Sequence, residues 1–310
     1  MKIFLTGASG LVGSAVARTA QRRGHHVVGV VGTFAGPIEG LAQQLRLDLA
    51  DEAATTAAVL EGFPDAIVNC AAISVPEQCD AQPALAQTLN VALPALLART
   101  AHHLSARLVH LSSEQVFDGT GHRPYSARDA ARPLNLYARQ KQESETAVHA
   151  AAPEFAVTLR VPLLTGNSAG GQRSLHERLL IDWAAGKTPR LFVDELRQPC
   201  SAENLAEVIV EVCERTDLRG IQHWAGTELL SRHELGVRVR ERFKLSDAQA
   251  PIAKVARDDV PEVARKRPAR LPLEIAPLAG RLKTRPQSLA EQLAELRVPP
   301  PVRAWYQSLG

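Results

Sequence analysis

Residues 2–13 read KIFLTGASGLVG, a short apolar run followed at once by glycines in the pattern G-x-x-G-x-x-G. The run predicts a strand over residues 2–6, and the stretch after it predicts a helix over residues 11–23. Glycines allow a turn with positive φ and a close approach of pyrophosphate, and a helix N-terminus offers free N–H groups. Because the pattern lies between a first strand and a first helix, it predicts a dinucleotide site, with a plain tight turn as the alternative.

Short β-branched runs alternate with longer amphipathic stretches along the first half of the chain. Such alternation is typical of an α/β protein with a doubly wound parallel sheet, the Rossmann fold. After residue 162 the alternation weakens, and we expect a smaller, mainly helical C-terminal substrate lobe. The dinucleotide-binding domain is predicted over 1–162 with a return segment at about 196–222, and the substrate lobe over 163–195 and 223–310. The further predicted strands are 26–31, 46–48, 66–69, 107–112 and 156–161, and the further predicted helices are 52–61, 83–102 and 134–152.

The overall charge and the cysteines exclude several classes of protein. The chain has 36 Lys and Arg against 33 Asp and Glu, a net charge of +3, which argues against a protein that coats nucleic acid. The first residues leave no room for a signal peptide, and no apolar run approaches the ~20 residues of a membrane span, so we expect a cytoplasmic protein. The four cysteines show neither C-x-x-C spacing nor histidine clustering, so we expect no metal site and mostly buried, reduced thiols.

Basic residues gather in the last fifth of the chain, where residues 251–310 carry 11 Lys and Arg against 6 Asp and Glu. The cluster at Arg265–Arg270 would suit a phosphorylated ligand. A solvated basic loop explains the same residues equally well.

The end of the second predicted strand bears on the choice of cofactor. It reads VGVVGTF over residues 28–34 and contains neither an acid nor an arginine. An acid there would bond the ribose 2′-hydroxyl of NAD and repel the 2′-phosphate of NADP. Its absence favours NADP, with NAD left open, and makes Thr33 a candidate phosphate partner. Asp48, at the end of the next predicted strand, would hold the adenine amino group or cap the following helix.

Tyr137 and Lys141 form a Y-x-x-x-K pair, one turn apart on one face of the helix predicted over 134–152. A phenol of pKa ~10 exchanges protons poorly near neutrality, and an adjacent ammonium would lower that pKa. Upstream, Ser112 and Ser113 end a predicted strand at the sheet edge where ligands of such folds bind. A hydroxyl there would orient a carbonyl oxygen, although an ordinary strand-end serine would look the same.

These features together resemble the extended short-chain dehydrogenase/reductase family over nearly the whole chain. The likeness is closest to the dTDP-4-dehydrorhamnose reductases and to the regulatory β subunit of methionine adenosyltransferase. The segments that carry it are NCAA at 69–72, LNV at 89–91, SSEQVFDG at 112–119, PLNLY at 133–137, LRVP at 159–162, QP at 198–199, NLA at 204–206, GIQHWAG at 220–226 and RP at 267–268.

The resemblance implies a catalytic triad of Ser113, Tyr137 and Lys141. It also implies substrate contacts from Ser113, Glu114 and Gln115. Arg267 is added to them, because matching Arg-Pro segments in the family border the sugar-nucleotide site. The cofactor site that it implies is lined by Gly7, Ser9, Gly10, Leu11, Val12, Gly13, Thr33, Asp48, Leu49, Cys70, Ala71, Ala72, Asn90, Tyr137 and Lys141.

Two segments depart from the reductases of this family. Where these carry Asp-Tyr after the active hydroxyl, this chain has Glu114-Gln115, so the aromatic is gone and the second acid of the sugar-nucleotide dehydratases is missing. Val161-Pro162 is like the regulatory subunit, whereas the reductases have a sugar-contacting aromatic near that point. The resemblance implies an NADP-dependent reductase of a nucleotide-linked 4-keto sugar. A non-catalytic dinucleotide-binding regulatory subunit and a sugar-nucleotide epimerase are the alternatives, and a homodimer is left open.

Overall fold

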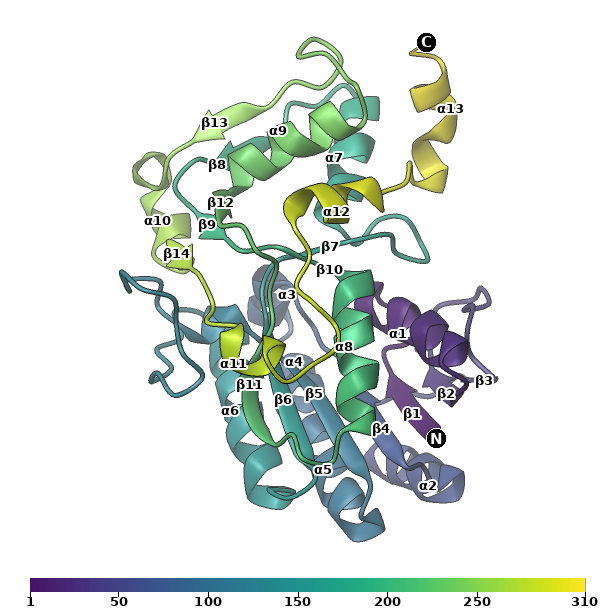
Figure 1. Cartoon of the computed structure of the whole chain (residues 1–310). Helices are drawn as coiled ribbons and strands as arrows, with labels where there is room; N and C mark the ends of the chain where they lie inside the picture. Colours follow the sequence, from purple (N-terminus) through teal and green to yellow (C-terminus); the bar gives the residue numbers. More distant parts are fainter. Residues whose placement is uncertain (310) are drawn as a thin grey trace.

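The computed structural model describes residues 1–309; Gly310, the last residue of the predicted substrate lobe, lies outside them. Its centre is a sheet of seven parallel strands in the order β11-β6-β5-β4-β1-β2-β3 (Figure 1). The strand order runs outward in both directions from β1 and β4, which confirms the predicted doubly wound Rossmann fold. The strands are β1 Lys2–Thr6, β2 His26–Val30, β3 Gln43–Leu45, β4 Ala66–Asn69, β5 Arg107–Ser113, β6 Ala156–Val161 and β11 Gly220–His223.

Helices cover both faces of this sheet. One face carries α1 and α8 side by side (Figure 1), and the other carries α2, α5 and α6. Ile3 and Leu5 of β1 belong to the core under α1 and α8, whereas Phe4 belongs to the core under α5 and α6, because successive side chains of a strand point to opposite faces. None of the helices within residues 1–309 is long and apolar enough to cross a bilayer. These helices are α1 Leu11–Arg22, α2 Glu52–Gly62, α5 Leu93–Leu104, α6 Leu136–Ala151 and α8 Ala202–Glu214.

The third strand differs from its prediction. β3 spans Gln43–Leu45 and not residues 46–48. It is an edge strand that pairs with β2 alone, and its last pair joins Leu45 to Val30, where β2 ends. Beyond Leu45, β2 offers no further partner, and the chain turns away: the Asp48 carboxylate accepts a hydrogen bond from the Ala50 N–H at 2.9 Å.

The helix predicted over 83–102 is helical throughout but is not one regular α-helix. A π-helical turn over Thr88–Ala92 joins α4 Pro83–Gln87 to α5, and the Leu93 N–H bonds the Thr88 carbonyl across it. Pro94 explains the irregularity, because it has no N–H to give to the Asn90 carbonyl four residues earlier. The turn leaves the Asn90 side chain fully buried.

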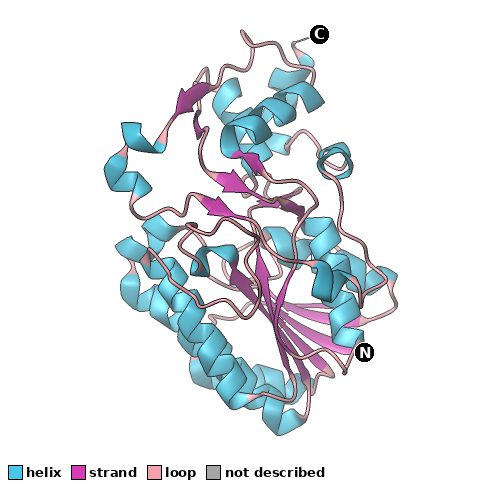
Figure 2. Ribbon diagram, turned by 60° about the vertical axis from the view of Figure 1, so that its left-hand side comes forward, coloured by secondary structure: helices cyan, strands magenta, loops and turns pink. Residues whose placement is uncertain are grey.

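A smaller, mainly helical lobe lies beyond one end of the sheet (Figure 2). Its core joins apolar residues of α7, α9 and α12 with Trp305 and Tyr306 near the C-terminus. Short strands complete it in the pairs β10-β7 and β13-β8 and the three-stranded order β12-β9-β14. The elements are β7 Leu164–Thr165, α7 Leu175–Ala184, β8 Arg190–Phe192, β9 Leu196–Arg197, β10 Cys200–Ser201, β12 Leu230–Ser231, α9 Arg232–Arg242, β13 Ala253–Val255, α10 Pro261–Ala264, β14 Arg270–Leu271, α11 Ala276–Ala279, α12 Leu289–Ala294 and α13 Arg303–Gln307.

The chain passes between the sheet and the smaller lobe repeatedly. The chain leaves the sheet after β6, returns to it as α8 and β11, and leaves it again. It then comes back over α8 as a segment around residues 283–285, which we call the strap. In that strap the N–H groups of Lys283 and Thr284 donate to the Glu211 carboxylate at 2.6 and 2.9 Å. The Asn204 amide donates to the Arg285 carbonyl at 2.9 Å. The strap therefore fastens the C-terminal quarter of the chain to the sheet.

The cysteines are mostly buried, as predicted. Cys79, Cys200 and Cys213 are buried and Cys70 is half-buried. Burial is the main cause that raises the pKa of the Cys70 and Cys213 thiols to about 12. Thiols with such a pKa are poor nucleophiles at neutral pH.

Gly13 tests how tightly the turn after β1 is packed. A Cβ at this position would lie 2.2 Å from the Gly7 carbonyl oxygen, so we expect Gly13→Ala to destabilise the protein by about 1–3 kcal/mol. Gly62→Ala is the matched control, because a Cβ there meets nothing nearer than Phe4 at 3.9 Å. Thermal unfolding should show a lowered Tm for Gly13→Ala alone. Equal Tm values for the two variants would contradict the packing argument.

Candidate active site

The glycine-rich turn joins β1 to α1 and touches the segment that follows β4. Gly7 has a φ of +64°, and a Cβ there would lie 2.8 Å from the Ala71 backbone nitrogen. Gly10 caps α1 in an extended conformation without a side-chain hydrogen bond, so no cap uses the N–H groups of the first turn. A helix terminus of this kind suits the negative charge of a phosphate.

The other residues predicted to line the cofactor differ in exposure. Thr33 and Asp48 are exposed, and Leu49 is half-buried. Asp51, not Asp48, caps α2, because its carboxylate accepts the Ala54 N–H at 2.9 Å. Near the turn, Val12 and Gly13 are buried. The other predicted residues there are half-buried: Gly7, Ser9, Gly10, Leu11, Cys70, Ala71 and Ala72.

Asn90 holds the segment after β4 in place. Its Oδ1 accepts the Ile73 N–H at 2.9 Å, and its Nδ2 donates to the Ile73 carbonyl at 3.0 Å. Nδ2 also donates to Gln140 Oε1 at 3.0 Å, which ties this segment to α6. Both ends of the Asn90 amide are thus used within the protein, so Asn90 is a positioning residue for the segment after β4.

A row of buried polar side chains crosses the sheet beneath the glycine-rich turn. Thr6 Oγ1 donates to Asn69 Oδ1 at 2.6 Å, and Asn69 Nδ2 is 3.1 Å from His110 Nδ1. His110 Nε2 is 3.0 Å from Ser144 Oγ, which donates to the Lys141 carbonyl at 2.7 Å. Thr6, Asn69, His110 and Ser144 are all essentially without solvent contact. The row connects the end of β1 to the helix that carries Lys141.

The three predicted catalytic residues come together where β5 ends and α6 begins. Ser113 is the last residue of β5 and is buried. Tyr137 is buried in the first turn of α6, which Asn135 caps by accepting the Ala138 N–H at 2.8 Å. Lys141 lies one turn further, with its Nζ 5.9 Å from the Tyr137 ring centroid and donating to the Leu111 carbonyl at 2.9 Å.

Burial sets the protonation of Tyr137 and Lys141. It raises the pKa of Tyr137 to about 12, and the Ser113 hydroxyl opposes this rise. The expected lowering of this pKa is therefore wrong for the protein on its own, because desolvation of the phenol is the largest effect and raises it. Burial also lowers the pKa of Lys141 to about 8, against the opposing charge of Glu145. Tyr137 is a neutral phenol at pH 7, which is the form that can give a proton.

Glu114 and Gln115 follow Ser113 but face protein partners. Glu114 is buried with Oε1 3.3 Å from Arg197 Nε, and burial raises the pKa of its carboxyl to about 8. Gln115 Oε1 accepts from Asn135 Nδ2 at 3.2 Å and so supports the cap of α6.

Arg267 is not free in this structure. Its Nε and Nη2 bond the two carboxylate oxygens of Glu195 at 2.5 and 3.1 Å. Glu195 is fully buried, and Arg197 Nη2 lies 3.7 Å from it. Sequence reasoning missed Glu195 and Arg197, because nothing in the local pattern relates residues so far apart in the chain.

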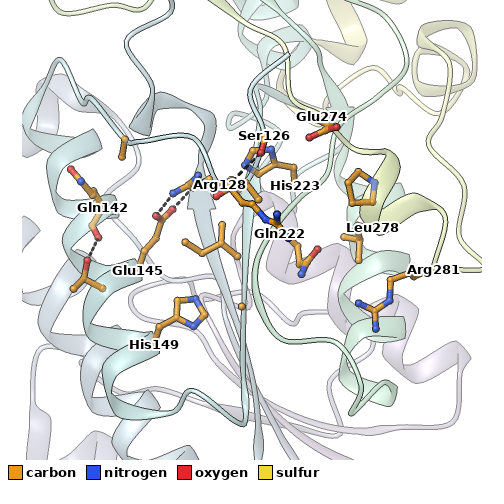
Figure 3. A pocket seen from close by; sticks show the side chains of 17 residues that line it. Ser126, Arg128, Gln142, Glu145, His149, Gln222, His223, Glu274, Leu278 and Arg281 are labelled. Carbon is orange, nitrogen blue, oxygen red and sulfur yellow. Dashed lines mark hydrogen bonds and ion pairs between the residues drawn. The ribbon is translucent and has the colours of Figure 1, made fainter. Parts of the chain in front are cut away.

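A separate hollow of about 900 Å³ lies at the β11 edge of the sheet (Figure 3). It is bordered by α6, by β11 and by the segment around α11, and includes none of the three catalytic residues. At its floor Arg160 bonds Glu145 through Nε and Nη2 at 2.8 and 2.7 Å. These two charges satisfy each other, so we assign the hollow no part in the active site.

Comparison of the sequence and the fold with those of known proteins identifies the family of this chain. The family described as "RmlD substrate binding domain" matches residues 1–297. The chain belongs to this family. Among the structures similar to this RmlD-family protein is one described as a hypothetical dTDP-4-dehydrorhamnose reductase from Sulfolobus tokodaii, with a TM-score of 0.81 and 28% identity over 96% of this chain and 100% of that one.

Two curated relatives of this RmlD-family protein differ in what their names describe. The methionine adenosyltransferase 2 subunit beta of Xenopus laevis is 32% identical over 252 residues, 79% of this chain and 72% of that protein. The probable low-salt glycan biosynthesis reductase Agl14 of Haloferax volcanii is 30% identical over 305 residues, 96% of this chain and 97% of that protein. The resemblance to both kinds of relative is thereby confirmed at the level of the family.

The lowered pKa of Lys141 predicts a pH-dependent contribution to stability. Between pH 8 and pH 10.5 an unfolded lysine keeps a proton that Lys141 has lost in the folded protein, so its contribution to the free energy of unfolding rises with pH. We therefore expect the stability of wild type relative to Lys141→Met to rise by about 3 kcal/mol across this window. Urea unfolding at pH 7 and pH 10.5 measures it, with the exposed Lys254→Met as the control. A difference that does not change with pH would refute the assignment.

Proposed function

We propose that this protein is an NADP(H)-dependent reductase of a carbonyl substrate, a nucleotide-linked 4-keto sugar. The observation that carries the proposal is the meeting of Ser113, Tyr137 and Lys141 at the carboxyl end of β5. This end of the sheet is where open α/β folds bind ligands. The glycine-rich turn of the same sheet supplies the dinucleotide site.

The residues around the turn fit a nicotinamide dinucleotide. Gly7 and Gly13 leave no room for a side chain, and the uncapped terminus of α1 offers N–H groups to a pyrophosphate. We assign the 2′-phosphate to exposed Thr33, because no carboxylate stands at the end of β2 to repel it. When bound, the cofactor supplies the hydride for reduction of the carbonyl carbon.

The triad handles the oxygen of the substrate carbonyl. The Ser113 hydroxyl donates a hydrogen bond to that oxygen and orients it. Tyr137, a neutral phenol at pH 7, gives the oxygen its proton as charge develops there. The Lys141 ammonium uses one N–H for the Leu111 carbonyl, which leaves two for the cofactor ribose and for the phenolate that forms. Asn90 keeps the segment after β4 in position beside the cofactor.

The named relatives divide between two candidate functions. The Haloferax volcanii protein and the Sulfolobus tokodaii structure carry reductase in their descriptions and align with nearly the whole chain. The Xenopus laevis relative is named as a subunit of another enzyme, which favours a non-catalytic dinucleotide-binding subunit as the second candidate. The complete triad supports the reductase, because a purely regulatory protein has no use for a proton donor.

Cofactor choice is the first test of the proposal. Because the end of β2 holds no carboxylate for a ribose diol, NADPH should bind at least as tightly as NADH. Fluorescence or calorimetric titration of the purified protein measures both affinities. A clear preference for NADH would overturn the NADP assignment while leaving the reductase open.

Turnover decides between reductase and subunit. When the protein is mixed with NADPH and dTDP-4-dehydrorhamnose or a related nucleotide-linked 4-keto sugar, it should oxidise NADPH. The absorbance of NADPH should therefore fall with time. Tyr137→Phe should lower kcat at least about a hundredfold and leave NADPH affinity nearly unchanged, because the phenol acts mainly in the transition state. Tyr306→Phe, whose hydroxyl bonds the Phe243 carbonyl in the smaller lobe, is the matched control. Full activity in Tyr137→Phe would contradict the role of Tyr137 as proton donor. If the wild type reduced none of these sugars, the non-catalytic dinucleotide-binding subunit would be favoured.

A further inference from the structure

Three arginines surround two buried carboxylates beside Ser113. One carboxylate is Glu114, which directly follows Ser113, and the other is Glu195. Arg197 lies between them, with Nε 3.3 Å from Glu114 and Nη2 3.7 Å from Glu195. Arg267 bonds Glu195 through two nitrogens. Arg197 and Arg267 therefore already pair with both carboxylates of this cluster.

Arg232 is the third arginine, and it has no partner for its charge. It begins α9 directly after β12, whose Ser231 pairs with Leu196 of β9. This register places Arg232 beside Glu195, and its backbone N–H donates to the Glu195 carbonyl at 3.1 Å. Its half-buried guanidinium makes neither a hydrogen bond nor an ion pair with any residue from 1 to 309.

A half-buried guanidinium without a partner is costly, because it loses water without gaining a counter-charge. Burial, together with the charges of Arg267, Arg197 and the exposed Arg178, lowers the pKa of Arg232 to about 10, against the opposing charge of Glu195. The guanidiniums of Arg232, Arg267 and Arg197, with Arg178 nearby, thus surround Glu195, whose carboxyl pKa is lowered and which is ionised at pH 7. The Glu114 carboxyl, with a pKa of about 8, is largely protonated at that pH. An anion at this place would relieve the repulsion among the arginines.

We propose that Arg232 binds the diphosphate of a nucleotide-linked substrate, and that Arg267 holds Glu195 in place instead of contacting that substrate. The inference rests on the proposed function and revises the role that sequence reasoning gave to Arg267. A diphosphate diester carries two negative charges, which would offset much of the excess positive charge of the cluster. A guanidinium can bond two of its oxygens at once. Glu114 joins the cluster to Ser113, so the anion would lie next to the position proposed for the carbonyl.

The kinetics of one variant that removes the charge and one that keeps it test the assignment. Arg232→Gln should raise KM for dTDP-4-dehydrorhamnose at least about tenfold, as expected for the loss of charge-assisted hydrogen bonds, with kcat within about twofold. Arg232→Lys keeps the charge but loses the paired donors, and its KM should lie between those of wild type and Arg232→Gln. NADPH affinity should be unchanged in both. An unchanged KM in Arg232→Gln would overturn the proposal.

Thermal stability separates Arg232 from Arg267 without any turnover. Arg267→Gln should lower Tm by several degrees, because it removes both hydrogen bonds to the buried Glu195 carboxylate and leaves only Arg197, 3.7 Å away, as its partner. Arg232→Gln should leave Tm unchanged or raise it, because it removes repulsion and breaks no ion pair. A lowered Tm in Arg232→Gln equal to that of Arg267→Gln would show that Arg232 is a structural partner and would contradict the proposal.

Inorganic pyrophosphate tests the anion site directly. It should raise the Tm of wild type, less so at higher salt, and leave the Tm of Arg232→Gln unshifted. The glycine-rich turn is intact in both proteins, so equal shifts would place pyrophosphate there and overturn the inference. If wild type reduces no nucleotide sugar while the shifts still differ, the proposed reductase fails and the anion site at Arg232 stands.

Discussion

Thr6, Asn69, His110 and Ser144 donate hydrogen bonds in one direction across the sheet, and both halves of the active site are attached to this row. Asn69 Nδ2 can only donate, so His110 Nδ1 accepts and the ring proton is on Nε2, which donates to Ser144. Burial lowers the pKa of His110 well below its ordinary value and keeps the ring neutral, which preserves this direction. The turn after Thr6 and the helix that carries Lys141 are therefore held in fixed register across β1, β4 and β5.

Buried ionic contacts adjoin two residues of the triad. Glu145, one helical turn after Lys141, pairs with Arg160, and Glu114, next to Ser113, lies 3.3 Å from Arg197. Glu145 and Arg160 are each 4% exposed at their side chains, and the Ser112 hydroxyl donates to Glu145 at 2.5 Å. Glu145 also opposes the effect of burial on the pKa of Lys141. Desolvation of such pairs consumes most of their Coulomb energy, but removal of one partner leaves an uncompensated charge in the interior. The ion pairs therefore specify this arrangement more than they strengthen it.

The sequence predicts the parts of this structure that depend on neighbouring residues. The strand, the glycine turn and the helix over residues 2–22 follow from local pattern, and the spacing of Tyr137 and Lys141 places both on one helical face. β3 could not be located in this way, because pairing with β2 decides where an edge strand begins and ends. The π-helical turn had a signal in Pro94, which is four residues after Asn90.

The electrostatics of the site were beyond the reach of sequence patterns. The pKa of Tyr137 depends on how completely the folded chain removes water from the phenol. The pairing of Arg267 with Glu195 joins residues from different elements of the smaller lobe. A basic cluster in the sequence shows where cations are present, and only the fold shows which of them already have a counter-charge.

The repeated passage of the chain between the two lobes also constrains the order in which the protein is made. When residue 162 leaves the ribosome, the sheet still lacks β11 at its edge and α1 still lacks α8 as its neighbour. Glu211 on α8 receives its backbone donors only after Thr284 has been synthesised. Residues 1–162 therefore cannot finish folding before α8 and β11 have been made, and a gene cut after residue 162 would yield two incomplete pieces instead of two domains.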